Sequence, residues 1–195
     1  TLQQEAARKL GLTVSQTMMI AQHLYESGQI TYMRTDSVNL SKLCLSASKE
    51  EIVRLYGKEY SKTRQYHTSS KGAQEAHEAI RPTYMERAEI EGSSQEKRLY
   101  ELIWKRTVAS QMADAEIEKT TVTIAIKNQA TGVRSQEEFI AQGEVVKFDG
   151  FIKVYRESVD DEEQQDEFGH ILPPLKEGQE ISRSEERRVG KECRS

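Results

Sequence analysis

The octapeptide ITYMRTDS, residues 30–37, places Tyr32, Arg34 and Asp36 at alternate positions. In an extended segment, residues i, i+2 and i+4 share one face, so these side chains could point at a single ligand. A tyrosine phenol, with an ordinary pKa of about 10, ionises more readily beside a cation. An arginine can donate two hydrogen bonds to phosphate oxygens as charge builds on phosphorus. The spacing could therefore serve attack of Tyr32 on a phosphodiester, with stabilisation by Arg34.

A phosphotyrosine ester resembles the phosphodiester that it replaces in free energy, so a strand cut in this way could be resealed without ATP. The octapeptide equally fits an ordinary surface strand in which Arg34 and Asp36 form an ion pair. From these eight residues alone, both interpretations stay open.

Residues 73–83 (AQEAHEAIRPT) concentrate four ionisable side chains, namely Glu75, His77, Glu78 and Arg81. Pro82 disfavours the helical conformation for the residue before it, Arg81. His77 and Arg81 are four residues apart, and on one helical turn they could grip a phosphate from the side opposite Arg34. The alternative is a capping histidine with local salt bridges. The two-histidine spacing of a zincin helix is absent, so the pattern does not indicate a metal site.

Charge is unevenly distributed along the chain, whose formal net charge is -4. Residues 157–168 (ESVDDEEQQDEF) contain acids and no bases, which leaves the remainder slightly basic. Residues 58–71 (KEYSKTRQYHTSSK) interleave four bases with aromatic side chains. Such a segment is typical of a surface that faces phosphates, and equally of a solvated basic loop.

The composition, with 195 residues, 36% hydrophobic and 31% charged, suits one or two small domains. No apolar run approaches the roughly 18 residues of a membrane span, and no signal peptide opens the chain. We therefore expect a cytoplasmic protein without a membrane partner. Cys44 and Cys193 lie far apart, which indicates neither a disulfide framework nor a zinc site. Cys44 is expected to be a reduced, half-buried helix residue.

Before residue 118, apolar positions recur with a helical period and predict four helices, at about 1–11, 13–28, 41–57 and 93–112. Capping boxes are expected at three starts: Thr1 with Gln4, Thr13 with Gln16 and Ser93 with Glu96. Glycines should end the first three helices. The residues expected in the core are Val14, Met18, Met19, Ala21, Tyr25, Leu45, Ile52, Leu55, Tyr56 and Trp104.

After residue 118 the period becomes two, which predicts strands at 120–127, 139–148 and 151–157. Asp149 and Gly150 should form the turn between the second and third strands. The segment 171–181 (ILPPLKEGQEI) is expected at a sheet edge, because its two prolines exclude a central strand. The Arg-rich residues 182–195 have no apolar period and indicate a tail of cloning origin outside the fold.

Together, ITYMRTDS and AQEAHEAIRPT resemble the type IA DNA topoisomerases. With methionine at position 33, the motif YMRTDS resembles the bacterial topoisomerase I branch, because topoisomerase III relatives usually carry proline at this position. The resemblance includes TLQQEAARKLG, TMMIAQHLYESGQITYMRTDS and LYELIWKRTVASQM, in the order of the family, over most of residues 1–115. It continues more weakly through KFDGFIKVY and ILPPLKEGQ, which resemble the β-rich arch of the family.

The resemblance implies an α+β fold: a helical winged-helix-like (CAP-like) tyrosine domain at 1–118, followed by part of a β-rich arch at 119–181. It implies a fragment of an enzyme that cleaves one DNA strand through a 5'-phosphotyrosine link, passes a strand and reseals it, relaxing negative supercoils. Tyr32 would be the nucleophile, Arg34 would stabilise the transition state and His77 would position the scissile phosphate. The residues assigned to DNA binding are Asp36, Arg81, Lys71 and Glu75.

In this family an acidic Toprim domain binds Mg²⁺, and nothing in this chain resembles it. We therefore expect that the fragment binds no metal, that it is inactive alone, and that its partners are single-stranded DNA and the rest of its parent chain in the bacterial nucleoid. The alternative is a non-catalytic winged-helix DNA-binding module. An exposed Tyr32 near Arg34 and His77 is required by the enzyme interpretation, and a buried Tyr32 would favour the alternative.

Overall fold

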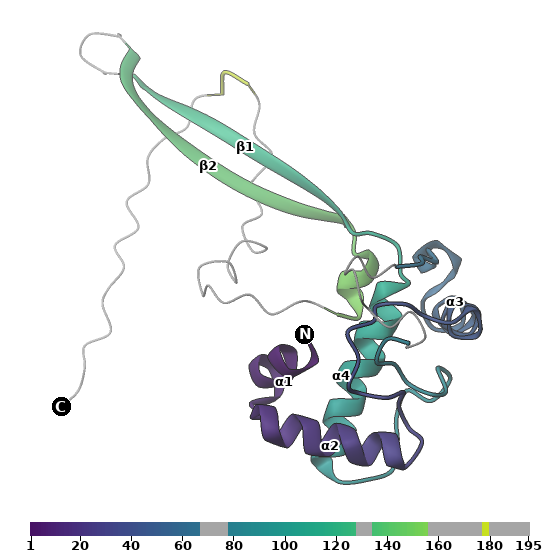
Figure 1. Ribbon diagram of the computed structural model, residues 1–195. Coiled ribbons are helices and arrows are strands. Elements are labelled where there is room, and N and C mark those ends of the chain that lie inside the picture. Colours follow the sequence, from purple (N-terminus) through teal and green to yellow (C-terminus); the bar gives the residue numbers. More distant parts are fainter. Residues whose placement is uncertain (67–77, 128–133, 156–176, 180–195) are drawn as a thin grey trace, which may run out of the picture.

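The computed structural model describes residues 1–66, 78–127, 134–155 and 177–179. A helical body carries a long two-stranded ribbon that projects from it (Figure 1). The elements in chain order are α1 (Leu2–Leu10), α2 (Val14–Glu26), α3 (Lys42–Tyr56), η1 (Lys58–Tyr60), α4 (Ser94–Ser110), β1 (Glu116–Lys127), β2 (Arg134–Phe148) and η2 (Gly150–Lys153). The predicted α+β class is confirmed. No helix in the described ranges is both long and apolar enough to cross a membrane.

The predicted helix ends are confirmed at most positions. Thr13 and Ser93 form complete capping boxes at the starts of α2 and α4, and Gly11 ends α1 in the left-handed conformation with φ 67°. The box predicted at Thr1 is wrong, because the Thr1 side chain accepts no capping hydrogen bond.

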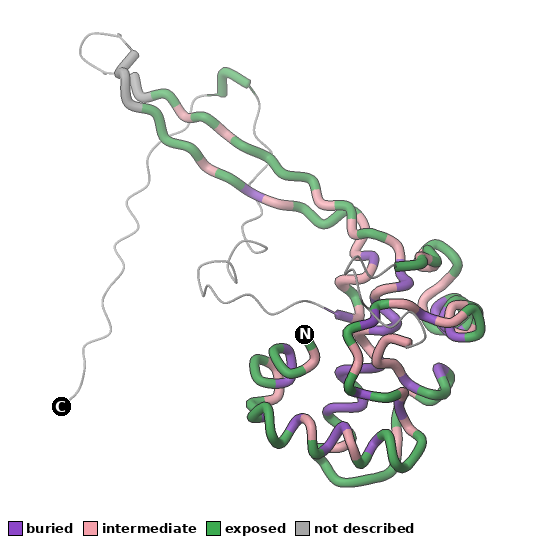
Figure 2. Tube along the Cα trace, viewed as in Figure 1, coloured by how far each residue is buried: buried purple, intermediate pink, exposed green. Residues whose placement is uncertain are grey.

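The core lies around α4, whose Leu99 and Val108 are fully buried. Trp104 is 4% exposed and its indole Nε1 donates to the Met85 carbonyl at 2.9 Å, so its predicted role as a core anchor is confirmed. Cys44 is fully buried in α3 rather than half-buried. Figure 2 shows how the buried residues concentrate in the helical body.

Several residues predicted in the core are instead exposed, namely Val14, Met19, Tyr25 and Leu55. In α2 the buried stripe runs through Ile20 and Leu24, so the face that packs is rotated from the predicted one. At the end of α3, the ring centroids of Tyr56 and of Tyr60 in η1 lie 6.3 Å apart, and Tyr56 is half-buried whereas Leu55 is exposed.

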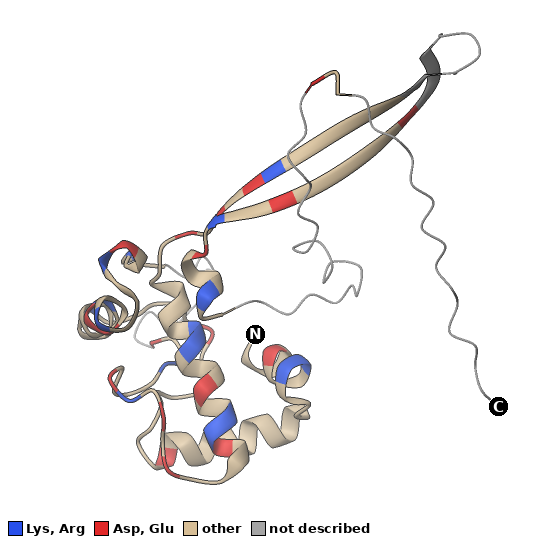
Figure 3. Cartoon of the chain, turned by 180° about the vertical axis from the view of Figure 1, so that it is seen from behind, with Lys and Arg blue, Asp and Glu red and all other residues tan. Residues whose placement is uncertain are grey.

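The ribbon confirms the strands predicted at 120–127 and 139–148. β1 and β2 pair antiparallel, with Thr120 opposite Gly143 and Ile124 opposite Phe139. Charges of both signs are interspersed along it (Figure 3), and two cross-strand ion pairs form: Lys119 with Glu144 at 2.7 Å and Lys147 with Glu118 at 2.8 Å. Phe139 and Ile140 remain 63% and 67% exposed, because no described element covers the ribbon.

The strand predicted at 151–157 is wrong over its described part, 151–155. Gly150 has φ 48°, and a Cβ there would lie 2.6 Å from the Ala113 carbonyl oxygen, so only glycine allows this close approach. The Phe151 N–H donates to that same carbonyl at 3.0 Å. The chain thus turns back into η2 at the root of the ribbon instead of forming a hairpin with β2.

Tyr155 explains why this segment folds onto the helices. Its hydroxyl donates to the buried Glu5 of α1 and accepts from Arg106 Nη1 of α4 at 2.9 Å. Burial and the bond with Glu5 raise the pKa of Tyr155 to about 12, so the phenol stays a donor. The other predicted segments after residue 155, namely the acidic stretch 157–168, most of the edge segment 171–181 and the tail 182–195, lie outside the described residues.

Candidate active site

The tyrosine loop, which we define as residues 31–41, follows α2 and the turn at Gly28. Gly28, with φ 72°, reverses the chain, and next to the loop the described residues form only an isolated bridge between Ile30 and Pro82. The short strand considered for residues 30–37 is therefore not formed. The Thr31 hydroxyl accepts from the Arg81 N–H at 2.9 Å and donates to the Ala79 carbonyl at 2.7 Å. The Thr31 side chain thus forms hydrogen bonds with backbone groups of Ala79 and Arg81 that a longer strand pairing would use.

The predicted alternation survives without a strand. Tyr32, Arg34 and Asp36 are exposed, whereas Met33, expected to turn away with Thr35, is buried and Thr35 is half-buried. Tyr32 is 39% exposed, so the condition that would have favoured a non-catalytic module is not met. Within the described residues, no ion pair joins Arg34 to Asp36, and the alternative of a simple surface ion pair is wrong. The open face therefore carries a phenol, a guanidinium and a carboxylate that a ligand can reach.

Tyr25, in the last turn of α2, contacts the predicted nucleophile. The Tyr25 and Tyr32 ring centroids lie 5.2 Å apart with an interplanar angle of 67°, an edge-to-face arrangement. Tyr25 is 41% exposed and belongs to the same surface. Its helical spacing suggested a core residue, and only the chain reversal at Gly28 brings the two rings together.

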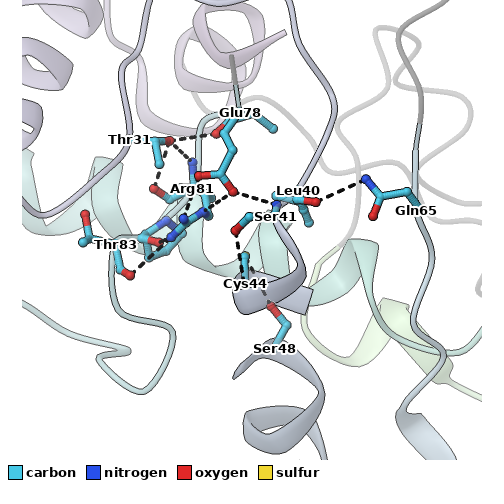
Figure 4. Close-up of polar contacts among 11 residues, drawn as sticks. Thr31, Leu40, Ser41, Cys44, Ser48, Gln65, Glu78, Arg81 and Thr83 are labelled. Atoms are coloured by element: carbon cyan, nitrogen blue, oxygen red, sulfur yellow. Dashed lines mark hydrogen bonds and ion pairs between the residues drawn. The ribbon is translucent and has the colours of Figure 1, made fainter. Parts of the chain in front are cut away.

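Arg81 lies inside the protein rather than on the open face, and Figure 4 shows its contacts. Its side chain is 12% exposed. Nε and Nη2 donate to the Glu78 carboxylate at 3.2 and 2.7 Å, and Nη1 donates to the carbonyls of Pro82 and Thr83 at 2.8 and 3.2 Å. Each guanidinium nitrogen thus donates within the protein.

Glu78 joins Arg81 to the far end of the tyrosine loop. Its carboxylate accepts the Ser41 N–H at 2.7 Å, at the start of α3, and the Ala79 N–H donates to the Asn39 carbonyl at 2.8 Å. Burial alone would raise the pKa of Glu78, but the hydrogen bonds from Arg81 and Ser41 outweigh it and lower that pKa. The sequence places Glu78 in a polar cluster but gives no sign of this contact, because Ser41 lies 37 positions away.

Three predicted site residues, Lys71, Glu75 and His77, lie outside the described residues. The described part of the basic segment 58–71 contacts the root of the ribbon. Lys62 and Arg64 each contact Asp114 at 2.6 Å. The hydrogen bond from Lys62 is the main cause of the lowered pKa of Asp114. Among the described residues, no three His, Cys, Asp or Glu side chains gather so that they could hold a metal ion.

Comparisons with known proteins define the class of this chain. A family model described as DNA topoisomerase matches residues 1–192. The chain therefore belongs to the DNA topoisomerase family, as the motifs around Tyr32 predicted.

Individual relatives agree with that assignment. DNA topoisomerase 1 of Synechocystis sp. is 48% identical over 184 residues, which cover 91% of this chain and 20% of the relative. DNA topoisomerase 1 of Zymomonas mobilis is 51% identical over 163 residues, or 83% and 13% of the two chains. The solved structure of full-length topoisomerase I from Thermotoga maritima superposes with a TM-score of 0.67 at 36% identity, over 91% of this chain and 28% of that one. The chain thus spans a fifth or less of these two curated relatives.

Proposed function

We propose that this chain is the tyrosine-bearing segment of a type IA DNA topoisomerase, which cuts one DNA strand, passes a strand and reseals the break, relaxing negative supercoils. The observation that carries the proposal is the exposed face of Tyr32, Arg34 and Asp36 in a chain of the DNA topoisomerase family. The proposed substrate is DNA, mainly single-stranded, and the remaining partner is the rest of the parent chain.

In the proposed reaction the Tyr32 phenolic oxygen attacks a backbone phosphorus. A bond from this oxygen to phosphorus forms as the phenol gives up its proton, the bond from phosphorus to the 3' oxygen breaks, and the departing 3' oxygen takes up a proton to become a hydroxyl. The DNA 5' phosphate is then held as a phosphotyrosine, and the reverse attack reseals the strand. Arg34 stabilises the charge on the nonbridging oxygens, which a planar fork of N–H donors suits. We propose that His77 positions the scissile phosphate, with Asp36, Lys71 and Glu75 in DNA contact.

The family also implies Mg²⁺, which supplies charge that holds DNA phosphates in place. The described residues offer no cluster that fits it. We therefore propose that its ligands belong to a Toprim domain in other parts of the parent enzyme. The helices up to residue 118 would form the winged-helix-like DNA-binding domain, and residues 119–181 part of the arch.

The test replaces Tyr32 by phenylalanine in a full-length topoisomerase that carries this segment. Tyr32→Phe keeps the ring and its contact with Tyr25 but removes the nucleophilic oxygen, so both relaxation and the covalent protein–DNA product should disappear. Tyr84→Phe is the matched control, because Tyr84 is also exposed, at 47%, and should keep activity. Relaxation that survives Tyr32→Phe would contradict the proposal.

The chain by itself should bind single-stranded DNA weakly and should not relax supercoiled DNA. Positioning and charge stabilisation require phosphates held by groups outside these residues. Binding should be in the range of nonspecific affinities, on the order of tens of micromolar, and should weaken as salt rises. Mg²⁺-dependent relaxation by this chain alone, or binding that is indifferent to ionic strength, would refute this assignment.

A further inference from the structure

The tyrosine loop is held at both ends by one short segment, residues 78–83. At its first end, Thr31 exchanges hydrogen bonds with Ala79 and Arg81. At its far end, Asn39 and Ser41 contact Ala79 and Glu78. Figure 4 shows Arg81 and Glu78 side by side between Thr31 and Ser41. Among the described residues no regular strand pairing fixes the loop, and these contacts tie its two ends to the same segment.

We propose that the Glu78–Arg81 pair is a positioning device for Tyr32, and that Arg81 acts through the loop rather than by contact with DNA. The inference rests on the proposed function of Tyr32 as nucleophile. The pair couples the two ends of the loop: Glu78 accepts from both Arg81 and Ser41, while Arg81 donates to the Pro82 and Thr83 carbonyls that follow the Ile30 bridge.

The geometry of Arg81 supports a positioning role over a phosphate contact. Its side chain is 12% exposed, and its Nε, Nη1 and Nη2 atoms all donate to protein oxygens. A phosphate contact would require it to give up bonds to a carboxylate, which are about twice as strong as neutral ones. The exposed Arg34 is better placed to meet DNA.

The chain supplies a matched control in α3. Arg54 Nε and Nη2 donate to the Glu51 carboxylate at 2.9 and 2.6 Å, so this pair has the same three-residue spacing and the same two-bond geometry. It contacts no residue of the tyrosine loop through these bonds. Glu51→Gln therefore removes a comparable ion pair without touching the ends of the loop.

The first measurement is amide hydrogen exchange on this chain, which does not depend on activity. In Glu78→Gln and in Arg81→Lys, the Thr31 and Ser41 amides should exchange at least about tenfold faster than in the parent, because the bonds that hold the loop are weakened. Protection within α4 should stay the same, and Glu51→Gln should leave the loop amides unchanged. Equal loss of protection in α4 would show a general stabilising pair and overturn the proposal.

The second measurement is single-turnover cleavage of a saturating single-stranded oligonucleotide by the full-length enzyme. Glu78→Gln and Arg81→Lys should slow cleavage by about ten- to a hundredfold, because small misplacements of a reacting group carry losses of that order. Oligonucleotide affinity should stay within about twofold, since uniform binding is untouched. Glu51→Gln should cleave at the parent rate.

Arg81→Gln separates positioning from DNA contact. If Arg81 touched a phosphate, this variant would weaken binding and reduce the slope of log affinity against log salt by about 0.7, with little effect on cleavage at saturation. Positioning predicts an unchanged salt slope and slower cleavage. The first pattern overturns the proposal.

Tyr32→Phe in the same assay distinguishes a failure of the proposed function from a failure of the positioning role of Glu78 and Arg81. If Tyr32→Phe still forms the covalent product, the proposed function fails. If it is inactive while Glu78→Gln, Arg81→Lys and Arg81→Gln cleave at the parent rate, the function stands and the positioning proposal is overturned.

Discussion

The helical body and the ribbon are stabilised in different ways. In the body, α4 is surrounded by α1, α2 and α3, and side chains such as Leu99 and Val108 are fully buried. In the ribbon, β1 and β2 contact each other, and Phe139 and Ile140 face solvent. The body can therefore hold Tyr32 in a defined position, whereas an isolated two-stranded ribbon is marginal in water and gains stability only when another surface covers it.

Amide exchange should show the largest difference between the two regions. Amides of α4 open only with the whole body, while those of β1 and β2 can open locally, so we expect exchange in the strands to be at least about a hundredfold faster. The measurement uses dilute monomer, where no second copy covers the ribbon. Equally slow exchange in the strands and in α4 would establish a self-sufficient β region and remove the distinction.

Alanine substitutions sharpen the same comparison in free energy. Leu99→Ala should lower the free energy of unfolding of the body by about 2–5 kcal/mol, because it empties a fully buried site in α4. Ile140→Ala, at a side chain that is 67% exposed, should change it by less than about 0.5 kcal/mol. Denaturant unfolding followed by Trp104 fluorescence measures both. A comparable loss from Ile140→Ala would mean that the ribbon is covered in solution.

Two helix starts within the body offer a smaller and more local contrast. Ser93→Ala should destabilise the body by about 1 kcal/mol, because the Ser93 side chain accepts the Glu96 N–H and completes a capping box. Thr1→Ala should be close to neutral, since the Thr1 side chain makes no capping bond. Thermal unfolding of the two variants tests this order, and a larger effect at Thr1 would contradict it.

The smallest expected effect is the pH dependence of the tyrosine loop. The pKa of Glu78 is lowered in the folded state, so its stabilising contribution is complete above its unfolded pKa and is lost as pH falls through the folded value. Protection of the Ser41 amide should therefore decline below about pH 4, and Glu78→Gln should abolish that dependence. The ribbon amides should show no matching transition, and a shared one would assign the effect to global acid unfolding.

The sequence by itself determined the four helices, two strands and the family of the chain. Capping boxes at Thr13 and Ser93 and the glycine at the end of α1 act within three or four residues, so local patterns predicted them. The alternation in β1 and β2 is equally local. The motif around Tyr32 was sufficient to predict its exposure beside Arg34 and Asp36, even though the predicted strand is not formed.

Tertiary structure decided everything that depends on residues far apart in the chain. The Tyr155 hydroxyl donates a hydrogen bond to Glu5 of α1, and segment 151–155 therefore folds onto the helices although its apolar period is that of a strand. Arg81 turns inward because Glu78, Pro82 and Thr83 meet its donors in the folded loop. Tyr25 reaches Tyr32 only after the reversal at Gly28. Periodicity in the sequence indicates which face of a helix or strand is apolar. It does not indicate which groups form the hydrogen bonds of buried polar atoms, because those partners come from distant segments of the chain.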